Sequence, residues 1–324
     1  MTFFKTFALL TRQSANFGKQ LISSQLISSR NLSSKSIHVS NYDYDTLQVS
    51  SPCEHVLHVE LNRCDAKNAL NKEMFRELYE LFCRINDDQH CRAVVLSGTG
   101  KQFSVGLDYN DMIEMVSQIR GTSSRTAGMS DVARKAKYIR SMILLFQDSF
   151  TVLEQCSKPI IAAIHGPCVG SALGLVSAAD IRYASEDAYF HVKEIDTGRA
   201  PDMGGLQRIP RISGNDSYIR EMIYTARKVP ASEAKEMGMV SKLFADGEQT
   251  KKAAIETATL ISTKSPVAVQ GSKICMRYSR EHNTQDGLTL MANWNMAMLQ
   301  SEDVSNAAKG WRKDSTEVPT FSDL

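Results

Sequence analysis

The chain has 324 residues, of which 42% are hydrophobic and 23% are charged, and its formal net charge is +2. This balance is that of an ordinary globular protein and excludes a disordered chain, a collagen-like fibre and a mucin-like stalk. Uninterrupted apolar runs are far shorter than the roughly 18 residues of a membrane-spanning helix, and no basic stripe with interleaved aromatic residues indicates nucleic-acid binding. The seven cysteines form no Cys-x-x-Cys pair and no cluster with histidine. We therefore expect neither a disulfide framework nor a metal site.

The first 40 residues differ in composition from the rest of the chain. They contain nine serines and five basic residues but no acidic residue, and Phe3, Phe7 and Leu10 recur at helical spacing. This composition is typical of a mitochondrial transit peptide, and the alternative is a disordered N-terminus without a targeting role. The last three residues, Ser-Asp-Leu, differ from the Ser-Lys-Leu peroxisomal signal. We expect a transit peptide over 1–40 and a mature protein in the mitochondrial matrix.

Strand and helix patterns alternate along the mature chain. Short apolar or alternating runs predict strands at 55–61, 93–96, 159–164, 181–184 and 189–192. Helical spacing predicts helices at 72–85, 132–153, 204–212, 218–226 and 231–237, with a helix of small residues within 166–180. A stretch rich in serine, threonine and glycine at 117–130 is interpreted as a loop that could lie over a site. From about residue 250 to 313 only helical patterns remain. This order predicts a mixed α/β core over 41–248 and a helical region over 249–324.

Two loops combine small residues with the end of a predicted strand. The first is Phe103–Asp108, and the second is Gly166–Ala172, which lies between a strand and a helix. Small residues let the backbone approach a ligand closely, and the free N–H groups of a helix start point toward it. Taken singly, such a loop is more often only a turn. We interpret the pair as candidate sources of backbone donors.

Two acidic residues lie between the predicted strand 189–192 and the predicted helix 204–212. Glu194 lies just past the strand end, where catalytic groups of α/β folds collect. Asp202 comes two residues before a glycine pair, so as a purely structural residue it would cap the following helix. His165 and His191 lie beside apolar strand residues and are interpreted as core residues rather than ligands.

Four ordered segments together resemble the enoyl-CoA hydratase/isomerase (crotonase) superfamily. They are Leu61–Leu70, Phe103–Asp108, Lys158–Tyr183 and Val192–Pro210. The resemblance extends over nearly the whole mature chain, from about residue 49 to 311. It implies an α/β fold in which a crotonase-like spiral of ββα units precedes a C-terminal helical trimerisation region. Proteins of this kind form homo-trimers, usually paired into homo-hexamers.

The same resemblance implies an acyl-CoA thioester as substrate and no cofactor, because coenzyme A is part of the substrate. The thioester oxygen would be held by the backbone N–H groups of Leu107 and Ser171, which form an oxyanion hole for an enolate. Each such donor typically contributes roughly 10²–10³ in rate. Ser171 stands where the superfamily usually has glycine. The substrate-binding residues implied in this way are Val105, Gly106, Leu107, Asp108, Tyr109 and Ser171.

Within the superfamily, the likeness is to dienoyl-CoA isomerases, through Asp202 and the segments 130–138, 265–273 and 294–296. Hydratases hold one water between two glutamates, whose positions match Gly174 and Glu194, so we do not expect efficient hydration. Dienoyl-CoA isomerases place three acids at positions that match Gly174, Glu194 and Asp202. The resemblance makes Asp202 and Glu194 catalytic: Asp202 removes a proton from C2 and Glu194 protonates C6. This would convert 3,5-dienoyl-CoA into 2,4-dienoyl-CoA in the β-oxidation of unsaturated fatty acids.

The glycine at 174 leaves two alternatives open. The chain could be a Δ3,Δ2-enoyl-CoA isomerase that uses Glu194 alone. It could also be a catalytically weak acyl-CoA-binding homologue, because the third acid is absent. In the favoured scheme the base must be ionised and the acid protonated, so the surroundings of the two carboxylates must separate their pKa values.

Overall fold

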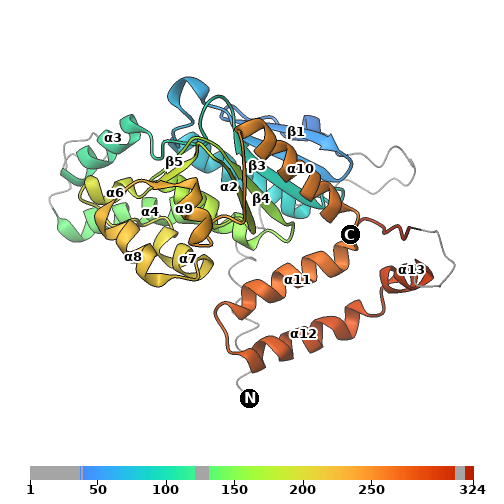
Figure 1. Ribbon diagram of the computed structural model, residues 1–324. Coiled ribbons are helices and arrows are strands. Elements are labelled where there is room, and N and C mark those ends of the chain that lie inside the picture. The colour runs from blue at the N-terminus through green and yellow to red at the C-terminus, as the bar shows by residue number, and fades with distance from the viewer. Residues whose placement is uncertain (1–36, 38, 121–130, 311–317) are drawn as a thin grey trace, which may run out of the picture. The chain divides into compact units, whose positions relative to one another are not determined.

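The computed structural model describes residues 37, 39–120, 131–310 and 318–324 (Figure 1). The chain groups into two units, Met1–Lys35 and Ser36–Leu324, and every element described here belongs to the second. The transit peptide predicted over 1–40 and most of the loop predicted over 117–130 lie outside the described residues.

The strands form two sheets. The larger has six strands in the order β1-β2-β3-β4-β6-β9, in which β1 pairs antiparallel with β2 and all other neighbours are parallel. Its strands are β1 Leu47–Cys53, β2 Val56–Leu61, β3 Ala93–Gly98, β4 Ile160–Ile164, β6 Ile181–Ser185 and β9 Lys242–Phe244. The smaller sheet has the order β5-β7-β8, with β5 Pro167–Val169, β7 Tyr189–His191 and β8 Val229–Pro230.

Several of the helices begin at polar residues whose side chains cap them. Asn71 accepts a hydrogen bond from the backbone N–H of Met74 at the start of α2, and Asp131 and Asp246 cap α4 and α10 in the same way. The helices are α2 Lys72–Asp87, α3 Tyr109–Arg120, α4 Val132–Gln155, α5 Ser171–Ser177, α6 Lys193–Asp196, α7 Gly205–Ile212, α8 Asp216–Thr225, α9 Ala231–Glu236, α10 Gly247–Ser262, α11 Pro266–Ser279, α12 Thr284–Met298 and α13 Glu302–Gly310. Two 3₁₀ helices lie at Val39–Asn41 and Cys64–Ala66.

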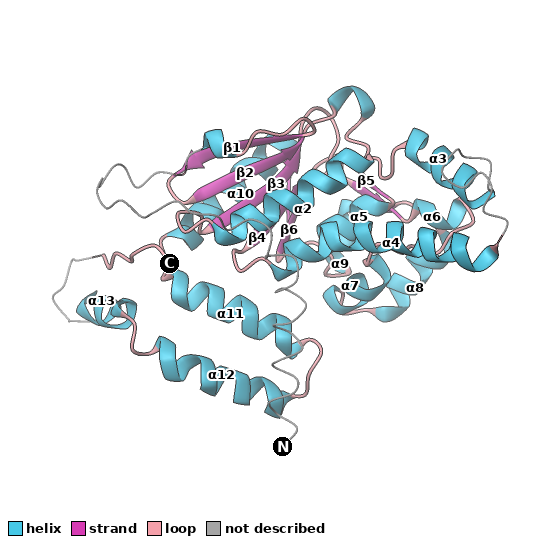
Figure 2. Ribbon diagram, turned by 180° about the vertical axis from the view of Figure 1, so that it is seen from behind, coloured by secondary structure: helices cyan, strands magenta, loops and turns pink. Residues whose placement is uncertain are grey.

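Both faces of the six-stranded sheet are covered by helices (Figures 1 and 2). Every residue of β3 is buried. Val94 and Leu96 belong to the cluster that contains the apolar faces of α2 and α4, whereas Ala93 and Val95 pack with α10. Parallel strands covered on both faces consist of near-continuous apolar runs. This is why the run at 93–96 predicts a buried strand.

The α/β class is confirmed, and each predicted strand and helix is present with ends shifted by a few residues. One prediction is wrong: residues 117–120 belong to α3 and not to a loop. Met112 and Val116 have the spacing of a helix, which continues into the polar stretch. The pattern also does not predict β1, β5, β8 and β9. β5, β8 and β9 have only two or three residues, which is too short for a reliable period, and the second half of β1 is the weakly apolar sequence Ser-Ser-Pro-Cys.

The helices after the sheet are attached to it in two ways. α10 packs on β2, β3, β4 and β6, so the first helix of the predicted 249–324 region covers the sheet. On α11, Lys273 Nζ lies 2.7 Å from Asp180 Oδ2 and donates to the carbonyl oxygen of Lys158 at 2.8 Å. α12 packs on α11 and exposes Leu288 and Met296.

Among the described residues, no helix combines the length and apolar character that crossing a membrane requires.

Candidate active site

The two loops singled out in the sequence lie side by side and are bonded to each other. Ser104 N donates to the carbonyl oxygen of Pro167 at 3.0 Å, and Val169 N donates to that of Ser104 at 3.1 Å. Gly106 has a φ of +89°, and a Cβ atom on it would be 2.6 Å from the carbonyl oxygen of Val169. Only glycine permits this backbone and this close approach. The fold therefore brings both candidate sources of backbone donors to one place.

The N–H groups of Leu107 and Ser171 donate to no other group within the described part of the chain. The residues on either side of Leu107 are fixed, because Leu70 N donates to Gly106 O at 2.8 Å and Asp108 N donates to Leu70 O at 2.9 Å. Ser171 is the first residue of α5, where an N–H has no acceptor within the helix. Two amides are thus held rigidly while their hydrogens stay free for a ligand.

An ion pair holds the loop Phe103–Asp108 at its last residue, Asp108. Arg63 Nη1 lies 2.8 Å from Asp108 Oδ2 and donates to the carbonyl oxygen of Ala69 at 2.6 Å. Burial alone would raise the pKa of Asp108, but the hydrogen bond and charge of Arg63, together with hydrogen bonds from the backbone N–H groups of Asn110 and Asp111, outweigh this and lower that pKa below its usual range. Asp108 is therefore a charged anchor of the loop. Tyr109 begins α3 with an exposed side chain, and Val105 N donates to Lys67 O.

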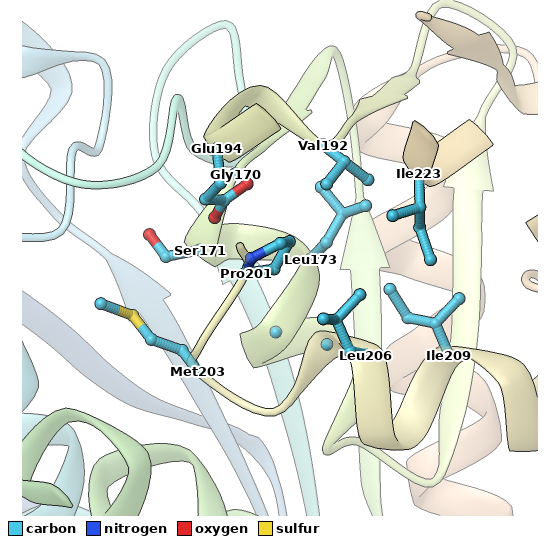
Figure 3. A pocket seen from close by; sticks show the side chains of 12 residues that line it. Gly170, Ser171, Leu173, Val192, Glu194, Pro201, Met203, Leu206, Ile209 and Ile223 are labelled. Carbon is cyan, nitrogen blue, oxygen red and sulfur yellow. The ribbon is translucent and has the colours of Figure 1, made fainter. Parts of the chain in front are cut away.

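A small cavity opens between the start of α5 and the helices α6, α7 and α8 (Figure 3). Its volume of about 20 Å³ is room for about one water molecule. The walls are mostly apolar, and their polar side chains are those of Ser171 and Glu194. The lining residues are Gly170, Ser171, Leu173, Gly174, Val192, Glu194, Pro201, Met203, Gly205, Leu206, Ile209 and Ile223.

Glu194 projects into this cavity from α6, directly after β7, and is only 8% exposed (Figure 3). Its Oε1 is 3.3 Å from the place that a Cβ on Gly170 would occupy, and its Oε2 has no hydrogen-bond partner in the described structure. Burial raises the pKa of Glu194, and the charge of Asp202 raises it further, while Arg199 opposes them. A raised pKa favours the protonated carboxyl group, which is the form that can give a proton to a bound ligand.

Asp202 lies between two cavity-lining residues, Pro201 and Met203. Its carbonyl oxygen accepts a hydrogen bond of 2.6 Å from Gln147 Nε2 on α4, which fastens the segment. The alternative that Asp202 caps a helix is wrong, because α7 is preceded by Gly204, at a φ of +89°, and has no side-chain cap. Its half-buried carboxylate acts electrostatically on Glu194. The structure thus gives Asp202 no capping role and leaves its charge within electrostatic range of Glu194.

The wall near Gly174 contains residues that sequence reasoning misses. A Cβ on Gly174 would be 2.9 Å from the carbonyl oxygen of Met203 and 3.2 Å from the ring of Phe150. Phe150 and Gln147 both come from the long helix α4, whose apolar spacing marks it only as a core helix. No local signal in the sequence indicates which residue of α4 meets α5. Position 174 therefore has no room for a third acid.

The two histidines expected in the core are buried and do not line the cavity. His165 Nε2 lies 3.1 Å from the carbonyl oxygen of Gly100, and His191 Nε2 lies 3.3 Å from a carboxylate oxygen of Asp196. Within the described ranges, Asp45, Glu73 and Glu77 bring carboxylate oxygens within 4.8 Å of one another. Glu77 already accepts hydrogen bonds from the backbone N–H groups of Asp45 and Thr46. We explain this cluster by the attachment of the segment before β1 to α2 and assign no metal to it.

Known proteins share this arrangement of segments. The family described as enoyl-CoA hydratase/isomerase matches residues 53–314. The chain belongs to this family. The family resemblance expected from the four sequence segments is thereby confirmed.

Relatives in this family include proteins from animals and plants. The chain is 48% identical over 288 residues to the mitochondrial Δ(3,5)-Δ(2,4)-dienoyl-CoA isomerase of Rattus norvegicus, covering 88% of this chain and 85% of that protein. Identity to the mitochondrial isomerase of the same name from Homo sapiens is 45% over 285 residues, with 88% and 84% covered. Identity to the peroxisomal one from Arabidopsis thaliana is 37% over 266 residues, with 82% and 93% covered.

Solved structures of the family share the fold. A crystal structure of enoyl-CoA hydratase from Bacillus anthracis matches with a TM-score of 0.74 and 26% sequence identity. The match covers 86% of this chain and 99% of that one. The enoyl-CoA hydratase/isomerase fold therefore extends over almost all of the described residues.

Proposed function

We propose that the chain converts 3,5-dienoyl-CoA into 2,4-dienoyl-CoA, a step in the β-oxidation of unsaturated fatty acids. The observation that carries this proposal is the buried Glu194, which has an unpartnered oxygen in the cavity beside Ser171 and lies within electrostatic reach of Asp202. The names of the relatives at 45% and 48% identity support the same reaction.

The reaction begins with the thioester oxygen at the two free amides. The N–H groups of Leu107 and Ser171 donate to that oxygen, which becomes negatively charged when a proton leaves C2. Donors fixed before the reaction stabilise this charge without reorganising, and each is worth roughly 10²–10³ in rate. The bonds between the two loops keep the amides in place.

Proton transfer then uses two carboxylates. Asp202 takes a proton from C2, and the electron pair of the broken C–H bond spreads over the dienolate from the thioester oxygen to C6. Glu194 gives its proton to C6, so that the double bonds come to lie at C2 and C4. Asp202 then holds a proton and Glu194 is ionised, and exchange with solvent resets both. The raised pKa of Glu194 suits the acid in this scheme. All atoms balance without a metal or a redox cofactor, and coenzyme A is part of the substrate.

The wall at Gly174 disfavours hydration of a double bond. Hydration in this family needs a water held between two acids, and the Cβ of a second acid at 174 would contact Met203 and Phe150. A single carboxylate lacks the partner that would activate and orient the water.

One alternative activity is Δ3,Δ2-enoyl-CoA isomerisation by Glu194 alone. It is favoured by the observation that Glu194 lines the cavity while Asp202 does not. A second alternative, a catalytically weak acyl-CoA-binding homologue, is motivated by the missing third acid. Turnover of a 3-enoyl-CoA but not of a 3,5-dienoyl-CoA would favour the first alternative. Binding of both without turnover would favour the second.

The proposed location is the mitochondrial matrix, and the proposed assembly is a homo-trimer or homo-hexamer. The basic, acid-free leader and the names of the mammalian relatives support this location, although the relative from Arabidopsis thaliana is named peroxisomal. Apolar side chains exposed on α12 support assembly through the helical region. Fractionation of cells that express the full chain and light scattering of the purified protein test these proposals.

The activity is tested with purified protein and a 3,5-dienoyl-CoA. The absorbance of a conjugated 2,4-dienoyl thioester should appear, and Asp202→Asn should lower the rate by about 10²–10⁴-fold, the usual contribution of a general base. Asp196→Asn is a matched control, because Asp196 is an exposed acid of the same segment that pairs with Lys193. An inactive wild type, or an Asp202→Asn variant as active as the control, would contradict the proposed function.

A further inference from the structure

A buried serine hydroxyl in the cavity has no bonding partner. Ser171 is 4% exposed, and its Oγ makes no hydrogen bond within the part of the chain that the structure describes. Other buried serines of the same region are paired: Ser177 Oγ donates to Gly174 O at 2.7 Å, and Ser104 Oγ donates to Asn68 O at 2.7 Å. A buried hydroxyl without a partner destabilises the folded state, because the water it loses on burial is not replaced. An unpaired group of this kind calls for an explanation.

Glu194 is not the hydrogen-bond partner of the Ser171 hydroxyl. Glu194 Oε2 is also buried and unpartnered, and both residues line the same cavity, yet no hydrogen bond joins them. Figure 3 shows the Ser171 side chain pointing away from the apolar wall made by Leu206, Ile209 and Ile223. The hydroxyl is therefore on the polar side of the cavity, next to the free amide of its own residue.

We propose that the Ser171 hydroxyl is a third donor to the thioester oxygen, beside the amides of Leu107 and Ser171. This inference rests on the proposed function, because it places the thioester at those amides. The N–H and O–H groups of one serine can both reach a single oxygen atom, since Oγ and N are separated by only two carbon atoms. Ser171 lies in α5 and does not have a positive φ, so its Cβ introduces no backbone strain.

A hydroxyl here would compensate in part for the lost third acid. It adds no charge near Glu194, and it stabilises the enolate directly. A hydrogen bond to a charged group contributes enough to change a rate by about ten- to a hundredfold. Ser171 would then be a catalytic residue through its side chain as well as its backbone.

The test uses a conjugated 2,4-dienoyl-CoA as a spectroscopic probe with the full-length protein. Donors on the carbonyl oxygen polarise the conjugated system and move its absorbance to longer wavelength. We expect Ser171→Ala and Ser171→Gly to reduce this red shift equally and to lower kcat/KM for a 3,5-dienoyl-CoA by about ten- to a hundredfold. Ser177→Ala, which removes a buried hydroxyl from the same helix, should leave the shift unchanged. Circular dichroism checks that each variant is folded.

Three results would overturn the proposal. The red shift could be as large in both variants as in the wild type. Ser171→Gly could behave like the wild type while Ser171→Ala does not, which would assign the effect to the methyl group of alanine and not to the loss of the hydroxyl. The variants could move only the pH profile, which would make the hydroxyl a partner of Glu194. A wild type that shifts the probe spectrum without turnover contradicts the proposed function but not this inference, and one that leaves the spectrum unchanged contradicts both.

Discussion

The ring of Phe150 lies where a side chain on Gly174 would have to go. A Cβ built on Gly174 would be 3.2 Å from ring atom Cε2 of Phe150, and Phe150 itself is completely buried. The carbonyl oxygen of Met203 is also in the way, 2.9 Å from the same Cβ. The absence of a third acid is therefore built into the packing of α4 against α5 and is more than the loss of one side chain.

Restoring an acid at this position should destabilise the protein. Gly174→Asp forces a Cβ against backbone and a rigid ring and buries a carboxylate, so we expect a loss of about 2–4 kcal/mol in the free energy of unfolding. Turnover of 3,5-dienoyl-CoA should not rise. Urea unfolding and the dienoyl-CoA assay measure the two effects.

A glycine with open surroundings provides the control for that variant. Gly214 has no atom within 4 Å of its would-be Cβ, so Gly214→Ala should unfold at nearly the wild-type urea concentration. If Gly174→Asp is as stable as the wild type and its turnover is faster, the residues around position 174 move aside at little cost, and the prediction is wrong.

Glu194 should destabilise the folded protein when it is ionised, although the proposed reaction needs this carboxyl group. Its pKa is raised by burial and by the charge of Asp202, so the folded protein holds this proton more tightly than the unfolded chain. The stabilisation from Glu194 is complete below the unfolded pKa of about 4.3, and it is lost as the pH rises through the folded pKa. Glu194→Gln should therefore gain stability over wild type at pH 8 but not near pH 4, while activity falls by about 10²–10⁴-fold.

Urea unfolding of both proteins across this pH range checks the prediction. Asp196→Asn serves again as control, because Asp196 lies in the same short helix but is exposed. Equal stability of wild type and Glu194→Gln at every pH would mean that the buried carboxyl is not strained by its surroundings.

The ion pair between Arg63 and Asp108 should contribute to both rate and stability. Arg63→Gln removes a partly buried pair of 2.8 Å, at a loss of about 1–2 kcal/mol in stability. Since the pKa of Asp108 is lowered in the fold, this loss is present at neutral pH and shrinks as the pH falls through the folded pKa. The freed loop should misplace the Leu107 amide and lower kcat/KM about tenfold or more.

Steady-state kinetics at neutral pH and urea unfolding at neutral and acid pH measure both parts. Arg76→Gln is a suitable comparison, because Arg76 is an exposed residue of α2 that pairs with acids of the same helix. If Arg63→Gln keeps full activity, the loop holds its shape without the pair.

The sequence contains much of the fold and part of the site. The fully buried β3 and the capped, amphipathic α2 are readable because local patterns determine them. Glu194 is readable as a carboxylate just after a strand. The role of Phe150 is not, because which face of α4 meets Gly174 depends on contacts between residues 24 positions apart. That the Ser171 hydroxyl lacks a hydrogen bond cannot be predicted from the sequence either, because it depends on which groups surround it in the folded cavity.

Deuterium exchange tests the division of roles between the two acids most directly. In D₂O with a 3,5-dienoyl-CoA, the wild type should form 2,4-dienoyl-CoA with deuterium at C6. Glu194→Gln should exchange the C2 hydrogens of the substrate without forming product, because Asp202 still removes a proton there. Asp202→Asn should show neither C2 exchange nor product formation beyond the background measured in the absence of protein. If Glu194→Gln loses the C2 exchange and Asp202→Asn keeps it, Asp202 is not the base at C2, and the account of the site is wrong.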